Sequence, residues 1–138
     1  MNRQEVCQFS YLVVDDDPVA SELLGSTLSH MGAERMFFAP DAAVALRLAQ
    51  QHQPDFILLD LYMPKVDGWT ALDQLRQVAP QAAVVVVTGS HQTADFMQSM
   101  DERVDGYCIK PVLPDLMEKA LTNARTRRSS ARLGTARP

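Results

Sequence analysis

The chain of 138 residues predicts an α/β fold: a single doubly wound, five-stranded parallel sheet with helices on both faces. Short apolar runs alternate with segments whose apolar residues recur with a period near 3.6, as in amphipathic helices. Most of the runs are continuously apolar, which is expected of parallel strands buried on both faces. The expected strands are Tyr11–Val14, Met36–Ala39, Phe56–Leu59, Ala83–Val87 and Gly106–Ile109.

Five helices are expected to follow these strands, one after each. The stripe of the first helix consists of Ala20, Leu23, Leu24, Thr27, Leu28 and Met31. Asp17 and Pro18 suit its N-cap and first turn, and Gly32 suits its C-cap. The stripe of the last helix consists of Leu113, Leu116, Met117, Ala120, Leu121 and Ala124. The fourth helix is expected after Thr88, in "HQTADFMQSM".

Length and composition indicate one globular domain, because the chain can build one full core but not two. Hydrophobic residues make up 46% and charged residues 22% of the sequence. No apolar run approaches the ~20 residues of a membrane span, and the N-terminus lacks the apolar core of a signal peptide. We therefore expect a cytoplasmic protein with reduced thiols at Cys7 and Cys108, the latter buried in a strand.

Charge is distributed unevenly along the chain. Residues 1–121 contain 8 Lys and Arg against 17 Asp and Glu, a net charge of −9, whereas the remaining residues contain five Arg and no acid. We expect an N-terminal extension at residues 1–9, a folded domain at 10–124, and a basic disordered tail or linker at 125–138.

Chemically distinctive residues follow four of the expected strands. Asp15 and Asp16 follow the first strand, Asp60 the third, Thr88 the fourth and Lys110 the fifth. Because the carboxyl ends of parallel strands meet at one edge of a sheet, these side chains are expected to converge there. Like charges about 4 Å apart repel by roughly 4 kcal/mol at an effective dielectric constant near 20. A hard divalent cation such as Mg²⁺ would relieve that repulsion.

The sequence resembles the receiver domain of two-component response regulators, including the chemotaxis regulators. The resemblance covers residues 10–124 and depends on four features in order. These are the acidic pair after the first strand, the D-x-x-M-P-x-x-D-G segment beginning at Asp60, a Thr followed by a small residue, and Lys110-Pro111. It implies a flavodoxin-like (βα)5 sheet with strand order 2-1-3-4-5.

The resemblance implies a phosphoacceptor and a metal site. Asp60 matches the aspartate that accepts a phosphoryl group from a phosphohistidine. Asp15, Asp16, Asp60 and the backbone carbonyl of Tyr62 match the ligands of Mg²⁺, for which Mn²⁺ can substitute. Asp60 would therefore end a rigid strand because a nucleophile needs a fixed position beside the cation.

The resemblance also implies a set of phosphate-binding and switch residues. Lys110 matches the lysine that pairs with the phosphoacceptor, and Thr88 matches the hydroxyl that bonds the phosphate. A backbone amide at Gly89 could donate to the same group. Tyr107 matches the switch aromatic, with an ordinary half-buried strand residue as the alternative. The Lys110–Pro111 bond is expected to be cis, as in the family.

The resulting hypothesis is a signalling phosphoacceptor rather than a turnover enzyme. Its expected partners are a sensor histidine kinase or histidine phosphotransfer protein, then a downstream protein or covalent output domain. The phosphoryl group would switch the surface formed by the last two helices and strands. The alternatives are a receiver module from a longer regulator or hybrid kinase, and a module that binds without phosphorylation. A homodimer is also compatible with the sequence.

Two rival functions are weaker. A haloacid-dehalogenase-type phosphatase would need a second aspartate two residues after the nucleophile, where Tyr62 stands. The basic tail could attach weakly to nucleic acid or acidic lipid, but it has no aromatic or groove-fitting element, so specific nucleic-acid binding is not expected.

Overall fold

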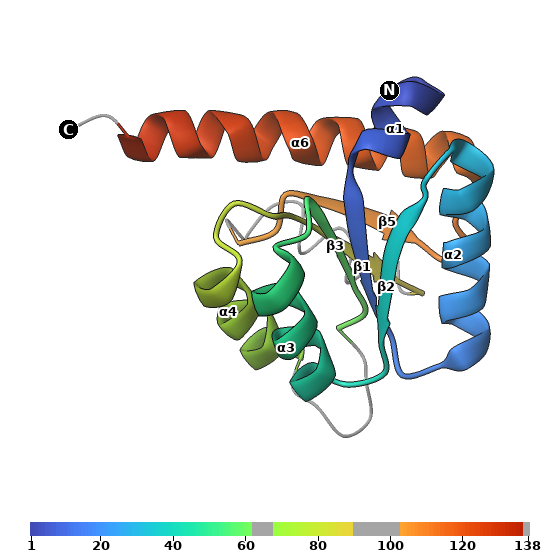
Figure 1. Cartoon of the computed structure of the whole chain (residues 1–138), viewed down its shortest axis with the longest axis horizontal. Helices are drawn as coiled ribbons and strands as arrows, with labels where there is room; N and C mark the ends of the chain where they lie inside the picture. The colour runs from blue at the N-terminus through green and yellow to red at the C-terminus, as the bar shows by residue number, and fades with distance from the viewer. Residues whose placement is uncertain (62–67, 90–102, 137–138) are drawn as a thin grey trace.

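The computed structural model describes residues 1–61, 68–89 and 103–136, with residues 131–136 described by backbone alone. Its strands form one parallel sheet in the order β2-β1-β3-β4-β5, which confirms the predicted fold class (Figure 1). The strands are β1 (Ser10–Val14), β2 (Arg35–Ala39), β3 (Phe56–Leu59), β4 (Ala83–Thr88) and β5 (Gly106–Ile109). The observed β3 and β5 have the predicted bounds, and each of the others is longer by one residue at one end.

Helices cover both faces of the sheet. On one face lie α3 (Ala42–His52) and α4 (Gly68–Val78), and on the other lie α2 (Pro18–Met31) and α6 (Pro114–Ala136) (Figure 1). The helix expected after Thr88 falls in residues 90–102, outside the described part of the chain.

The central strands lie between two apolar layers. Every residue of β1, β3 and β4 is buried, as their continuous apolar runs predict. Side chains alternate between the layers, so that Leu12 packs toward α3 and α4 while Val13 packs toward α2 and α6. Burying each such aliphatic side chain contributes roughly 1.5–3 kcal/mol. This sheet is therefore a rigid base for the residues at its carboxyl edge.

Helix α2 begins and ends as its sequence predicts. The Asp17 carboxylate accepts a hydrogen bond from the Val19 amide at 3.0 Å, with Pro18 in the first turn. Gly32 has a φ of 117°, the left-handed conformation that favours glycine at a C-cap. The predicted stripe is only partly buried, however, because Leu23 is 61% exposed.

A short helix that the sequence analysis did not predict, α1 (Arg3–Gln8), precedes the sheet. Asn2 and Glu5 form a reciprocal capping box at its start. Val6 is 1% exposed in the layer beneath α2 and α6, and its carbonyl accepts a 2.9 Å hydrogen bond from the Tyr11 hydroxyl. The N-terminal extension is therefore packed against the domain.

The C-terminal segment differs from the predicted disordered tail or linker, because α6 continues to Ala136. Alanine and arginine are good helix formers, and two arginines hold this part of α6 to the domain. The Arg125 guanidinium lies 4.8 Å above the Phe9 ring and 3.6 Å from Glu5, and Arg128 Nε lies 3.8 Å from Asp105. Figure 1 shows α6 running along the domain and beyond it.

The structure also bears on the expected thiol state of the two cysteines and on the search for a membrane-spanning helix. Cys7 and Cys108 are free thiols, and Cys108 is buried in β5 as predicted. Among the described residues, no helix combines the length and the apolar character needed to cross a bilayer.

Candidate functional site

Three carboxylates meet at the carboxyl edge of the sheet. Asp15 and Asp16 directly follow β1, and Asp60 directly follows β3, the parallel neighbour of β1. One carboxylate oxygen from each lies within 4.8 Å of the others. Asp15 and Asp60 are 2% and 8% exposed, whereas Asp16 is exposed. The structure therefore brings together the aspartates that the sequence analysis singled out.

Backbone hydrogen bonds extend the sheet ladder into this cluster. The Asp15 amide donates to the Ala39 carbonyl at 3.1 Å, and the Asp60 amide donates to the Val14 carbonyl at 3.0 Å. The Asp15 Oδ1 atom also accepts from the Asp17 amide at 2.9 Å. Both buried carboxylates are consequently held by the rigid strands before any ligand binds.

A lysine from the far strand completes the cluster. Lys110 follows β5, and its Nζ lies 2.8 Å from Asp15 Oδ2 and 3.4 Å from Asp60 Oδ2. Burial lowers the pKa of Lys110, but its hydrogen bond to Asp15 and the charge of Asp60 raise it, and the pKa ends above its ordinary value. The side chain therefore remains a cation. The closer partner is Asp15, which the resemblance did not imply.

The backbone around Lys110 connects it to the neighbouring strand. Its amide donates to the Thr88 carbonyl at 2.7 Å, and the Lys110–Pro111 bond is cis, which confirms that expectation. Thr88 is fully buried at the end of β4, and Gly89 after it is exposed. A Cβ placed on Gly89 would meet no atom of the described residues within 4 Å.

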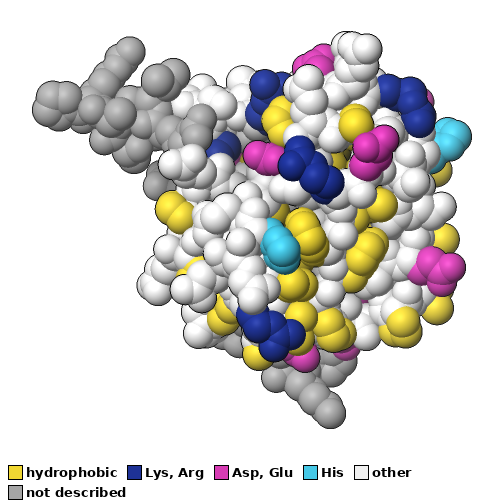
Figure 2. All heavy atoms as spheres, viewed as in Figure 1, with side chains coloured by type: hydrophobic (Ala, Val, Ile, Leu, Met, Phe, Trp, Pro, Cys, Tyr) yellow, Lys and Arg dark blue, Asp and Glu magenta, His cyan; other side chains and the backbone are white. Residues whose placement is uncertain are grey.

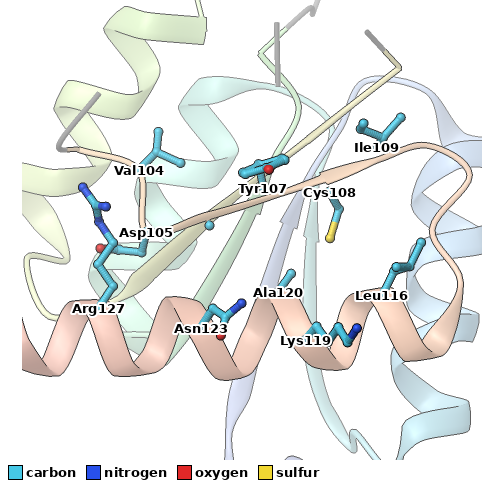
Figure 3. A pocket seen from close by; sticks show the side chains of 11 residues that line it. Val104, Asp105, Tyr107, Cys108, Ile109, Leu116, Lys119, Ala120, Asn123 and Arg127 are labelled. Atoms are coloured by element: carbon cyan, nitrogen blue, oxygen red, sulfur yellow. The ribbon is translucent and has the colours of Figure 1, made fainter. Parts of the chain in front are cut away.

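Tyr107 is half-buried in β5 and packs against the core layer of α3 and α4. It also lines a pocket of about 560 Å³ between β5 and α6 (Figure 3). In this view Cys108 points toward α6, while Tyr107 and Ile109 point the other way. The site aspartates, Thr88 and Lys110 do not line this pocket, so it is separate from the carboxylate cluster.

The donor set of the cluster fits a hard divalent cation. Asp15, Asp16 and Asp60 offer only oxygen ligands, which Mg²⁺ and Mn²⁺ accept. Asp16 is exposed, which leaves one side accessible to water and phosphate oxygens. Tyr62, whose carbonyl was expected to be the remaining protein ligand, lies outside the described residues.

Comparison with known proteins places nearly all of this chain in the family that the sequence resembles. The model of the response regulator receiver domain family matches residues 11–122. The DNA-binding dual master transcriptional regulator RpaA of Synechocystis sp. is 39% identical over 102 residues, which is 72% of this chain and 42% of RpaA. Response regulator Rre1 of Synechocystis sp. is 32% identical over 124 residues, covering 88% of this chain and 54% of Rre1.

Solved structures similar to this chain also include response regulators. The bacteriophytochrome response regulator RtBRR superimposes with a TM-score of 0.74 at 27% identity, covering 93% of this chain and 94% of that one. By contrast, the chain spans only about half the length of the sequence relatives it matches (42% of RpaA, 54% of Rre1).

Proposed function

Because the chain belongs to the response regulator receiver domain family, we propose that it is a phosphorylation-driven switch whose phosphoacceptor is Asp60. One observation carries the proposal: Asp60 ends a buried strand with its carboxylate beside those of Asp15 and Asp16 and 3.4 Å from the Lys110 ammonium. The arrangement combines a fixed nucleophile with a cation-binding set and a permanent positive charge.

The chemistry follows from this arrangement. A carboxylate oxygen of Asp60 forms a bond to phosphorus while the bond from phosphorus to the donor's imidazole nitrogen breaks, and the imidazole keeps that electron pair. The product is an acyl phosphate on Asp60. Lys110 offsets the added negative charge from its position between Asp15 and Asp60. Mg²⁺, held by the three aspartates, would neutralise phosphoryl oxygens when bound.

The proposed switch starts at the end of β4. A phosphoryl group adds about −1.5 to −2 charges and accepts strong hydrogen bonds. The Thr88 hydroxyl and the Gly89 amide are candidate donors beside Lys110, because the Lys110 amide binds the Thr88 carbonyl and the Lys110 ammonium lies 3.4 Å from Asp60. Movement there would reach Tyr107, which contacts both the core and the pocket beside α6. The change is thus passed toward the last strand and helix.

An apolar surface near the site suits the protein that donates the phosphoryl group. Of the five exposed large hydrophobic side chains among the described residues, four lie at or near the starts of α2 and α6: Val19, Leu23, Leu113 and Leu116. A groove of about 300 Å³, lined by Leu23, Lys110 and Pro111 among others, lies between α2 and the residues that join β5 to α6. Apolar side chains surrounding a reactive group favour docking of a protein rather than of a small metabolite.

The proposal extends to the cellular role. The donor is a histidine kinase or phosphotransfer protein, and the recipient of the signal is a downstream protein or an attached output domain. Beyond gaining and hydrolysing its own phosphoryl group, the domain turns over no substrate. A cytoplasmic location accompanies this role.

Intact mass spectrometry after incubation with phosphoramidate tests the proposed function. We expect one phosphoryl adduct that requires Mg²⁺ and is absent from Asp60→Asn. Asp17→Asn is the matched control, because Asp17 is an exposed N-cap in the same acidic run and asparagine caps equally well. An unmodified wild-type protein would leave a module that signals by binding alone, and an adduct that persists in Asp60→Asn would place the phosphoryl group on another residue.

A further inference from the structure

A groove runs along the free edge of the sheet, between β2 and α2. Among the described strands, β2 is outermost and pairs with β1 alone. The groove has a volume of about 620 Å³, with Met36 and Phe38 of β2 on its floor and Glu22 and Gly25 of α2 on its wall. Figure 2 shows apolar side chains gathered at the centre of this face, over β2. We call this the β2 groove.

Small residues on α2 create the groove. Ser21, Gly25 and Ser29 line it where larger helix residues would close it. A Cβ added to Gly25 would lie only 2.8 Å from the tip of the Phe38 ring, so the ring occupies the space that a side chain would need. Phe38 nevertheless remains 45% exposed. An exposed aromatic ring on a free strand edge is typical of the anchor residues in protein interfaces.

The charge of the groove indicates the charge of the ligand that it would bind. Its lining contains Asp15, Asp16 and Glu22 but neither lysine nor arginine. Asp16 and Glu22 are exposed at the surface. Since residues 1–121 carry a net charge of −9, the surrounding domain also repels acidic partners.

We propose that the β2 groove binds a basic, apolar peptide segment of a partner protein. An apolar side chain of the segment packs on Phe38 and Met36, and a lysine or arginine pairs with Glu22 or Asp16. The opposite charge steers the segment to the groove, and burial of the aromatic ring provides the affinity. This surface is distinct from the apolar groove beside Lys110, which involves other residues of α2.

The β2 groove shares Asp15 and Asp16 with the candidate cation site. A cation of the peptide near Asp16 and a divalent ion would compete for the same negative charge. Each should therefore weaken the binding of the other by the same factor. This coupling rests on the proposed function, whereas peptide binding through Phe38 and Glu22 does not.

The test uses the full chain and a capped synthetic peptide of alternating leucine and lysine, with a leucine–glutamate peptide of the same length as its control. Titration is followed by calorimetry and by backbone amide chemical shifts. We expect binding of the lysine peptide alone, with shifts at Gly25, Ser26 and Phe38. Shifts scattered over other carboxylates, or equal binding of the acidic peptide, would overturn the proposal.

Three variants identify the surface. Phe38→Ala and Glu22→Gln should each weaken binding by about tenfold, the usual loss for an anchor or a charge pair. Gly25→Ala should also weaken binding, because its methyl group displaces the Phe38 ring while both binding side chains remain. Leu116→Ala removes a comparably exposed apolar side chain, 52% exposed, from α6, outside the β2 groove, and should leave binding of the lysine peptide unchanged. Equal losses in Leu116→Ala and Phe38→Ala would show non-specific adsorption.

The coupling has a separate measurement. At constant ionic strength, added Mg²⁺ should weaken peptide binding to the wild type but not to Asp16→Asn. An affinity that does not change with Mg²⁺ would overturn the coupling. Failure of phosphorylation at Asp60 would overturn only the proposed function, since the peptide titration needs no phosphoryl group.

Discussion

Replacing Arg76 by methionine should be among the most destabilising single changes in the protein, because it removes the hydrogen-bonded cation from a buried carboxylate. The Asp105 side chain is 1% exposed. Its Oδ2 atom accepts hydrogen bonds from the Arg76 guanidinium and from the Val84 amide, the latter at 2.9 Å. Arg76 also donates to the carbonyls of Ala82 and Arg103, so it joins α4 to the residues that precede β4 and to those that precede β5.

The expected loss of stability follows from burial. Breaking a buried ion pair by removing one partner costs about 3–5 kcal/mol, a large fraction of the ~5–15 kcal/mol that stabilises an ordinary domain. Arg128 can compensate only in part, because its Nε lies 3.8 Å from Asp105 Oδ1, and neither atom forms a hydrogen bond within the described part of the chain. Methionine roughly keeps the side-chain volume, so the loss reports on charge rather than on a cavity.

Urea unfolding followed by circular dichroism measures this loss. Arg103→Met is the matched control: Arg103 pairs with Asp73 at the surface, where the side chains are 36% and 55% exposed. That pair should contribute about 1 kcal/mol or less. In Arg76→Met/Asp105→Asn, where the buried carboxylate itself is gone, part of the stability should return. A loss below about 1 kcal/mol in Arg76→Met would refute the argument from burial.

Three further changes probe other parts of the structure. Lys110→Gln should slow adduct formation on Asp60 by about a hundredfold in the phosphoramidate assay, since it removes the cation beside the acceptor; an unchanged rate would exclude that role. Gly68→Ala should lower the melting temperature, because its Cβ would overlap backbone atoms of Leu61, and an unchanged value would show that the helix start can shift. Burial raises the pKa of Cys108 from 9.0 to about 11, so the unfolded chain loses this proton first and the free energy of unfolding should fall between these pH values. In Cys108→Ala that part of the alkaline decline should disappear, and a decline equal to that of the wild type would contradict the assignment.

The sheet was predictable because its strands are unambiguous in sequence. β3 and β5 are short apolar runs with polar residues beyond them, and their observed bounds match the predicted ones. Helix α2 was equally readable at its ends, where Asp17 and Gly32 have local capping roles. These features depend on neighbours in the chain, which a sequence displays directly.

The two ends of the chain were harder to predict, because their structure depends on distant contacts. The Asn2–Glu5 capping box was readable, but the docking of α1 depends on burial of Val6. The arginines after Ala124 suggested a solvated tail, whereas Arg125 pairs with Glu5 across the fold. Net charge alone cannot distinguish a free arginine from one that holds a helix in place.

The candidate site was predictable in outline, because strand ends meet at one edge of a parallel sheet. From the sequence alone, that rule predicted that Asp15, Asp16 and Asp60 lie close together, as they do. It could not predict that Lys110 lies closer to Asp15 than to Asp60, since this depends on how β5 and its cis proline turn approach the edge. The metal-binding role of the Tyr62 carbonyl remains a prediction, because Tyr62 lies outside the described residues.

The central claim is that the phosphoryl group resides on Asp60, and locating the modified residue tests it most directly. Borohydride reduces an aspartyl phosphate to homoserine, which tandem mass spectrometry then locates in the digested protein. The account predicts homoserine at position 60 alone, and only after treatment with phosphoramidate and Mg²⁺. Homoserine at position 15 or 16, or a phosphoryl group that survives reduction on a serine or histidine, would contradict it.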